Sequence, residues 1–248
     1  MKKILPPAAL AVTVLAGWQI YVAVSGISEQ VLPSPVEVAR AFVNDAGTLW
    51  PAAWTTLSEI LAGYAIAAAV GCLLALGLSF SRLLEHATYP WLVISQVVPV
   101  PAIAALVVVW AGFGIAAKLV VVALVSFFPI AVNAIDGLRA SDPALLEALA
   151  SLGAGRTAQL RLVRVPTALP YIFSGLRIAA VLAVIGAVFA EWVGSSSGLG
   201  YLILTYNNEV ATPAEFAAIG VLALIAIALF AAVSALERVA LPWRRTTP

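Results

Sequence analysis

Residues 116–135 read AAKLVVVALVSFFPIAVNAI and contain a single charged side chain, Lys118. A helix of about 20 apolar residues is long enough to cross the roughly 30 Å hydrocarbon core of a bilayer. Five further ranges of the same character bring the predicted spans to six: 4–24, 57–79, 89–110, 171–191 and 214–236. The sequence therefore predicts an all-α, polytopic membrane protein.

The composition of the whole chain agrees with lipid as its solvent. Hydrophobic residues make up 63% of the 248 residues and charged residues only 10%, whereas about a quarter of a soluble domain is charged. The single cysteine, Cys72, and the single histidine, His86, exclude a disulfide framework and a metal site with several such ligands. A net charge of +1 gives no basic surface for nucleic acid.

The first range, 4–24, follows Met1-Lys2-Lys3 and is typical of either a secretory signal peptide or a retained helix. The apolar stretch is long enough to span, and no A-x-A cleavage site follows it. We therefore expect a retained first transmembrane helix.

The distribution of basic residues predicts the orientation, because cytoplasmic loops carry an excess of lysine and arginine. With the N-terminus inside, eleven of the thirteen basic residues are cytoplasmic, and only Arg40 and Lys118 lie outside. We expect a multi-pass protein of the cytoplasmic (inner) membrane with both termini in the cytoplasm.

Two parts of the chain are expected. Residues 1–54 form the first transmembrane helix and an outside amphipathic segment, and residues 55–248 form a five-helix core with a cytoplasmic loop at 139–168. In the outside segment, Ser34, Pro35 and Glu37 match an N-cap, a first-turn proline and a capping box.

The helix that follows this capping box carries Val38, Ala41 and Phe42 at helical spacing. We expect it to lie along the membrane interface. Contact with an external partner is the alternative interpretation.

The longest cytoplasmic connection, residues 136–170, has the signals of a short helix. Asp142 is placed to cap it, Pro143 suits its first position, and Gly153 is placed to end it in a left-handed conformation. A second short segment, at about 156–163, precedes Pro166, which we expect to break it.

The first of these helices is amphipathic. Leu145, Leu149 and Leu152 share one face, with Leu146 beside it, and Glu147 points away from that stripe. The loop is thus predicted to be a rigid, charged helical element at the cytoplasmic face.

The same loop carries a family resemblance. Glu147-Ala148-Leu149, Gly153 and Val163-Arg164-Val165-Pro166 resemble the E-A-A-x3-G-x9-I-x-L-P signature of binding-protein-dependent ABC importer permeases. Leu149, Val163 and Val165 depart from its alanine, isoleucine and leucine, and all three changes keep an apolar residue.

The resemblance implies that this loop is a coupling helix that contacts a separate cytoplasmic ATPase. The residues assigned to this coupling are Glu147, Ala148, Gly153, Arg156 and Pro166. Further segments resemble the branch that imports sulfonates, taurine, nitrate or thiamine-precursor pyrimidines: Leu32-Pro33-Ser34-Pro35, Pro99-Val100-Pro101, Glu191-Trp192-Val193-Gly194 and Gly198-Leu199-Gly200. Within that branch the sequence leans slightly toward a pyrimidine thiamine precursor.

Motifs for catalysis are missing from the sequence. A chain that hydrolysed ATP would need a G-x4-G-K-[ST] loop to hold the phosphates, and its three lysines all lie outside such a loop. The sequence also lacks H-E-x-x-H and G-x-S-x-G. We expect a protein that is not an enzyme and holds no cofactor or metal, with ATP bound by a partner subunit.

Polar groups inside the predicted spans are candidates for lining a solute pathway. Pro99, with Pro101, is expected to kink the third span and free backbone carbonyls. The candidates are Ser95, Gln96, Pro99, Ser126, Asn133 and Glu191. Hydrogen bonding between packed helices is the alternative role for the serine and asparagine side chains.

The resemblance further implies a homodimer, two copies of the ATPase and an external solute-binding protein. The scarcity of ionisable residues deep in the spans argues against a proton-coupled carrier, which needs a buried carboxylate relay. A secondary carrier or channel independent of an ATPase, and a membrane scaffold without transport, remain alternative readings.

Overall fold

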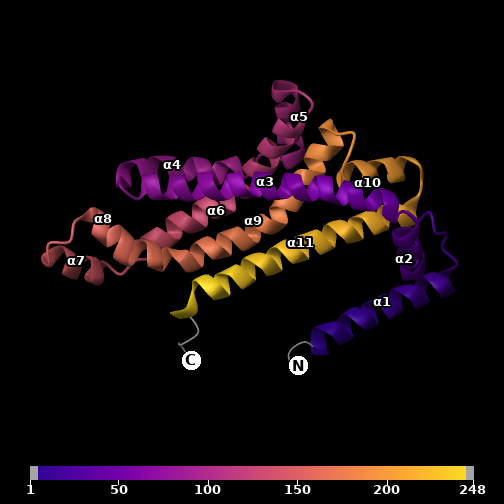
Figure 1. Ribbon diagram of the computed structural model, residues 1–248, viewed down its shortest axis with the longest axis horizontal. Helices are drawn as coiled ribbons and strands as arrows, with labels where there is room; N and C mark the ends of the chain where they lie inside the picture. Colours follow the sequence, from indigo (N-terminus) through magenta and orange to yellow (C-terminus); the bar gives the residue numbers. More distant parts are fainter. Residues whose placement is uncertain (1–4, 244–248) are drawn as a thin grey trace. The chain divides into compact units, whose positions relative to one another are not determined.

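The computed structural model describes residues 5–243, and every regular element within that range is a helix (Figure 1). The expected all-α class is therefore confirmed. Met1–Lys3 and Arg244–Arg245, which contribute to the predicted orientation, lie outside the described residues.

Four helical segments are long and apolar enough to cross a membrane: α3 (Ala46–Leu78), α6 (Ile115–Arg139), the continuous stretch Arg156–Gly194 and α11 (Thr212–Ala240). The bent helix pair α4 (Arg82–Ser95) and α5 (Val100–Ala111) brings the number of such segments to five if the pair is counted as one span. α1 (Leu5–Ser25) coincides with the first predicted range and has a shorter described apolar part, Ala9–Ser25. The six predicted ranges are compatible with this set.

The range 89–110 is not one straight span. Its two helices meet at an angle of 100°, with Pro99 as the N-cap of α5 and Pro101 in its first turn. Proline lacks the backbone N–H that would continue a helix across this point. The expected break at these prolines is confirmed.

The helix that contains the second predicted span extends beyond the predicted range 57–79. α3 starts at Ala46 and includes Pro51. Pro51 lies in the second turn of α3, beyond Leu49, whose N–H already bonds to the Asp45 carbonyl, so the missing proline N–H removes one backbone hydrogen bond from the helix. The tryptophan-rich stretch before residue 55 is thus part of the same helix as the span.

Contacts divide the chain into two compact units. One contains the described residues up to Thr56 and Ser196–Leu224, and the other contains Leu57–Ser195 with the described residues from Ile225 onward.

In the first unit, α2 (Pro35–Asn44) begins with the expected capping box. Ser34 N–H donates to Glu37 Oε2 at 2.6 Å, and Glu37 N–H donates to Ser34 Oγ at 3.3 Å. The bond from the Ser34 backbone, with that from its side chain, holds the pKa of the Glu37 carboxyl below its ordinary value. The capping box therefore stabilises the folded protein at neutral pH, and this contribution is lost as the pH falls through the lowered pKa of Glu37.

The apolar stripe of α2 lies against the chain itself. Val38, Ala41 and Phe42 are partly buried, and the Phe42 ring packs edge-to-face on Trp50 at 6.4 Å. In the same unit Trp18 contacts Phe216, and Thr212 Oγ1 donates to the carbonyl of Gln30 at 2.7 Å. α10 (Leu199–Asn208) completes this unit.

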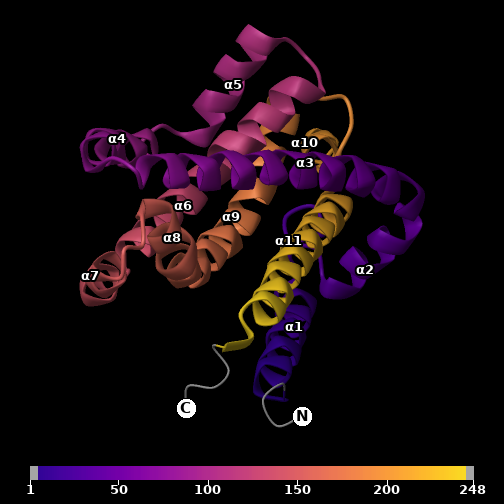
Figure 2. The same ribbon diagram turned by 60° about the vertical axis from the view of Figure 1, so that its left-hand side comes forward.

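In the second unit, α6 and α9 (Val165–Gly194) run side by side in both views (Figures 1 and 2). Small residues allow the close approach. A Cβ on Gly175 would stand 2.6 Å from the carbonyl oxygen of Pro129, and one on Gly137 would stand 2.7 Å from the Cβ of Tyr171. Small residues at such contacts let backbones pack tightly where lipid provides no hydrophobic driving force.

Gly175→Ala should destabilise the protein by about 1–3 kcal/mol, because the added methyl group must push α9 away from the backbone of α6. Gly77→Ala is the matched control, because a Cβ there meets nothing within 4 Å. Thermal unfolding of both variants in the same detergent measures the difference. Equal melting temperatures would show that the α6–α9 contact is looser than described.

Candidate functional site

The loop helix predicted from the sequence is α7 (Pro143–Ser151). Asp142 Oδ1 accepts a hydrogen bond from the Ala144 N–H at 2.9 Å, which caps the helix. At the other end Gly153 adopts φ +81°, and the Ala154 N–H bonds to the Leu149 carbonyl at 3.0 Å. The predicted start and end are confirmed.

No residue of α7 is buried. Leu145 is 49% exposed and Leu152, just after the helix, is 83% exposed, while Leu149 is partly covered. Glu147 and Ala148 are also exposed. A capped helix that leaves apolar side chains uncovered at the tip of a loop is typical of a protein–protein contact surface.

The second segment of the loop does not break at Pro166. It consists of α8 (Arg156–Gln159) and the π-helical turn η1 (Leu160–Arg164), and α9 then continues from Val165 through Pro166. The Val165 N–H bonds to the Leu160 carbonyl, five residues back. This wider turn accommodates the proline that follows, because the ring no longer meets a standard α-helical turn.

The continuous helix links the loop mechanically to the membrane span that follows it. Arg156 and Pro166, two of the residues assigned to coupling, belong to one continuous helical stretch that extends to Gly194. The loop is thus joined to a membrane span without a hinge at the proline.

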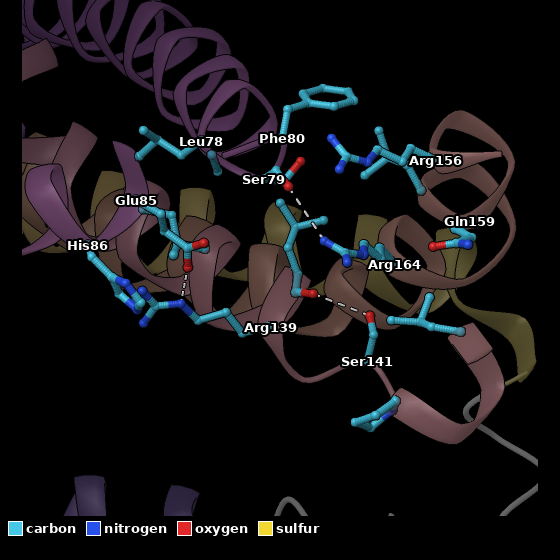
Figure 3. A pocket seen from close by; sticks show the side chains of 16 residues that line it. Leu78, Ser79, Phe80, Glu85, His86, Arg139, Ser141, Arg156, Gln159 and Arg164 are labelled. Carbon is cyan, nitrogen blue, oxygen red and sulfur yellow. Dashed lines mark hydrogen bonds and ion pairs between the residues drawn. The ribbon is translucent and has the colours of Figure 1, made fainter. Parts of the chain in front are cut away.

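A cleft of about 640 Å³ lies beside α7 in the second unit (Figure 3). Its walls come from the ends of α3, α4 and α6 and from α7, α8 and η1. Arg139 forms an ion pair with Glu85 and lies over the Tyr89 ring, 4.8 Å from its centroid. Arg156 and Arg164 line the opposite side.

The pathway candidates differ widely in exposure. Ser95, Gln96 and Pro99 are exposed at the break between α4 and α5. In contrast, Ser126 is 0% exposed and Glu191 is 1% exposed.

Asn133 bonds within its own helix, donating to the Pro129 carbonyl at 2.8 Å. The Ser126 hydroxyl has no hydrogen-bond partner among the described residues. The lining of a solute pathway therefore stays a prediction for all six candidates.

Sequence reasoning missed a buried ion pair. Lys118 Nζ contacts Glu59 Oε1 and also bonds to Ser195 Oγ at 3.1 Å, which ties α6, α3 and the end of α9 together. Both charged groups are more than nine-tenths buried. The available signal was two opposite charges near the same end of two predicted spans.

A second pair lies elsewhere in this unit. Arg177 donates to Glu237 Oε2 at 2.6 Å and to Ser174 Oγ at 3.1 Å. At both places pairing offsets the cost of placing a charge near the end of a span.

Replacing Lys118 with Met should destabilise the protein by about 3–5 kcal/mol, because Glu59 is then left buried without its counter-charge. The double variant Glu59→Gln/Lys118→Met should recover most of that loss. Thermal unfolding measures both, with Glu209→Gln as an exposed control. A double variant as unstable as the single one would contradict the pairing.

Several apolar helical spans around a tightly packed α6–α9 pair define a multi-pass membrane protein, with α7 as its exposed loop helix. Residues 67–245 match the family model described as "binding-protein-dependent transport system inner membrane component". The chain belongs to this family, and it is an ABC transporter permease component of the inner membrane.

Curated relatives match almost end to end. A probable ABC transporter permease protein of Haemophilus influenzae is 39% identical, over 92% of this chain and 93% of its own. The formylaminopyrimidine transport permease protein ThiX of Halalkalibacterium halodurans is 37% identical, over 97% of this chain and 96% of its own. The riboflavin transport system permease protein RibX of Chloroflexus aurantiacus is 38% identical, over 92% of this chain and 86% of its own.

A solved structure shares the fold. One chain of the crystal structure of an amino acid ABC transporter with histidines aligns with a TM-score of 0.59 at 20% identity. The alignment covers 85% of this chain and 96% of that one.

Proposed function

We propose that this chain is the membrane-spanning subunit of an ATP-driven importer of a small organic solute, and that α7 is the helix through which a separate ATPase drives it. The observation that carries the proposal is the exposed apolar surface of α7, formed by Leu145 and Leu152 on a helix capped at both ends. Such a surface needs a partner at the tip of the loop. Glu147, Ala148 and Gly153 then belong to that contact, and Arg156 and Pro166 couple it to the span.

The continuity of the stretch Arg156–Gly194 supports a mechanical role for the loop. Movement of α7 by the ATPase would be passed through α8 and the π-turn into the span, and from there to α6 through the glycine contacts. The chain itself binds no ATP in this proposal. Nucleotide binding and hydrolysis belong to the partner.

The proposed assembly contains two copies of this chain, two copies of the ATP-binding subunit and an external solute-binding protein. Both termini are cytoplasmic, because the positive-inside rule puts the arginine-rich ends of the spans there. The candidates Ser95, Gln96, Pro99, Ser126, Asn133 and Glu191 are proposed for the pathway. Ser95, Gln96 and Pro99 are already uncovered in a single copy.

For the solute we propose a compound with a pyrimidine ring. The support is that relatives at 37% and 38% identity are named for formylaminopyrimidine and for riboflavin, and both compounds contain such a ring. A sulfonate permease, the putative aliphatic sulfonates transport permease protein SsuC of Bacillus subtilis, is less similar at 32% identity. Organosulfonates, taurine and nitrate are the second choice.

The alternative is a secondary carrier or channel that works without an ATPase. Proton-driven carriers use ionisable groups inside the membrane as relays. Here Lys118 and Arg177 are held in ion pairs with Glu59 and Glu237. That arrangement favours structural roles for these four charges and an energy source outside the membrane.

Uptake into proteoliposomes distinguishes the two functions. The chain is reconstituted with the ATP-binding and solute-binding subunits that co-purify with it, and uptake of formylaminopyrimidine, riboflavin and taurine is measured with and without ATP. We expect uptake of a pyrimidine compound only with ATP and all subunits present. Uptake by the chain alone, driven by a proton gradient, would contradict the importer.

A further inference from the structure

The cleft beside α7 has charged groups that its own residues do not neutralise. Among the described side chains that line it, three are arginines and one is a glutamate. Arg139 and Glu85 neutralise each other, and the Tyr89 ring covers the Arg139 guanidinium. Arg156 and Arg164 therefore leave the lining with a net charge of about +2.

These two arginines have little else to bind. Arg164 makes one long hydrogen bond, 3.5 Å from Nη1 to the Ser79 carbonyl. Within residues 5–243 neither Arg156 nor Arg164 forms an ion pair. Figure 3 shows both guanidinium groups reaching into the cleft on the side of Ser79 and Phe80. Two such groups are suited to a phosphate, whose oxygens accept charge-assisted hydrogen bonds from them.

Apolar side chains line other parts of the cleft. Ala75, Leu78, Ile135 and Leu138 line it from the ends of the membrane helices α3 and α6. Basic and apolar walls that face one space suit an amphiphile better than a free inorganic ion. The volume, about 640 Å³, corresponds to roughly twenty water molecules and is enough for a phosphoglycerol group.

Exposed apolar side chains continue from this site along the chain. Phe80, which lines the cleft, is 52% exposed, and Leu83 and Leu84 at the start of α4 are 79% and 56% exposed. Side chains of this kind, next to the end of a membrane span, provide a surface for acyl chains at the level of the lipid headgroups.

We propose that this cleft binds the phosphate of an anionic phospholipid from the adjacent leaflet, with Arg156 and Arg164 as its ligands and the span ends as the surface for its glycerol and acyl groups. Basic pockets between membrane helices are the usual sites for such headgroups. The site is separate from the exposed leucines of α7. A bound lipid would hold the loop against the ends of α3 and α6.

Native mass spectrometry of the full-length chain, with any subunit that co-purifies, tests the proposal. The protein is titrated with phosphatidylglycerol, with phosphatidylcholine of the same acyl chains, and with inorganic phosphate alone. Wild type should retain phosphatidylglycerol at low ratios, and neither phosphatidylcholine nor phosphate should compete with it.

The variant Arg156→Gln/Arg164→Gln should bind phosphatidylglycerol about 25-fold more weakly, since each arginine contributes roughly fivefold. Arg161→Gln is the matched control, because Arg161 is exposed in the same segment and does not line the cleft. Its affinity should equal that of wild type. Thermal unfolding in phosphatidylcholine verifies that the variants are folded, and the wild-type lipid comparison stands even if the double variant is not.

Three results would overturn the proposal. One is equal retention of phosphatidylglycerol and phosphatidylcholine by wild type. Another is full competition by inorganic phosphate, which would make the cleft a site for a soluble anion. The third is unchanged lipid affinity in the double variant. If that variant also lost a co-purifying protein, the arginines would be ligands for that protein's acidic side chains.

Discussion

The close contact between α6 and α9 is the constraint on which the rest of the second unit depends. It exists because Gly137 of α6 and Gly175 of α9 have no Cβ at the points where the two backbones meet. The small side chains of Ala179, Ala183 and Ala187, which are fully buried along α9, also contribute. The two helices also bound the loop that holds α7. Fixing them against each other fixes both ends of that loop, so α7 is presented at a defined position without being buried.

Four of the charged groups near the spans are paired within the protein. The ion pairs Lys118–Glu59 and Arg177–Glu237 join helices of the spans and neutralise charges that lipid would penalise. In the described loop, the leucine surface of α7 is largely uncovered, and the two arginines of the cleft form no ion pair. A protein driven from outside the membrane needs surfaces of this kind, and needs few ionisable groups along its spans.

Local features of the fold were predictable from the sequence because their causes are local. Asp142, Pro143 and Gly153 set the limits of α7, and Ser34 with Glu37 set the start of α2, through capping bonds within a few residues. The break at Pro99 follows from the missing N–H. For the same reason the motif of the loop was enough to indicate the family.

Features that depend on the rest of the structure were not predictable. Pro166 signals a helix end, but a π-turn before it lets the helix continue, and nothing in the composition of residues 160–164 announces that turn. The pairing of Lys118 with Glu59 joins residues 59 positions apart, so only tertiary structure reveals it. The cleft is likewise formed by helix ends that are distant in sequence.

The central claim, that a separate ATPase drives this chain through α7, is tested most directly by co-purification from the native membrane. Wild type, Glu147→Arg and the exposed control Glu209→Arg are solubilised in mild detergent and purified by an affinity tag, and the bound proteins are identified by mass spectrometry. The account predicts that an ATP-binding subunit co-purifies with wild type and with Glu209→Arg. Its recovery with Glu147→Arg should fall at least about tenfold, because an arginine placed in the contact surface without a partner charge weakens binding by several kcal/mol. Recovery of no ATP-binding subunit with the intact wild-type protein, or equal recovery with all three, would contradict it.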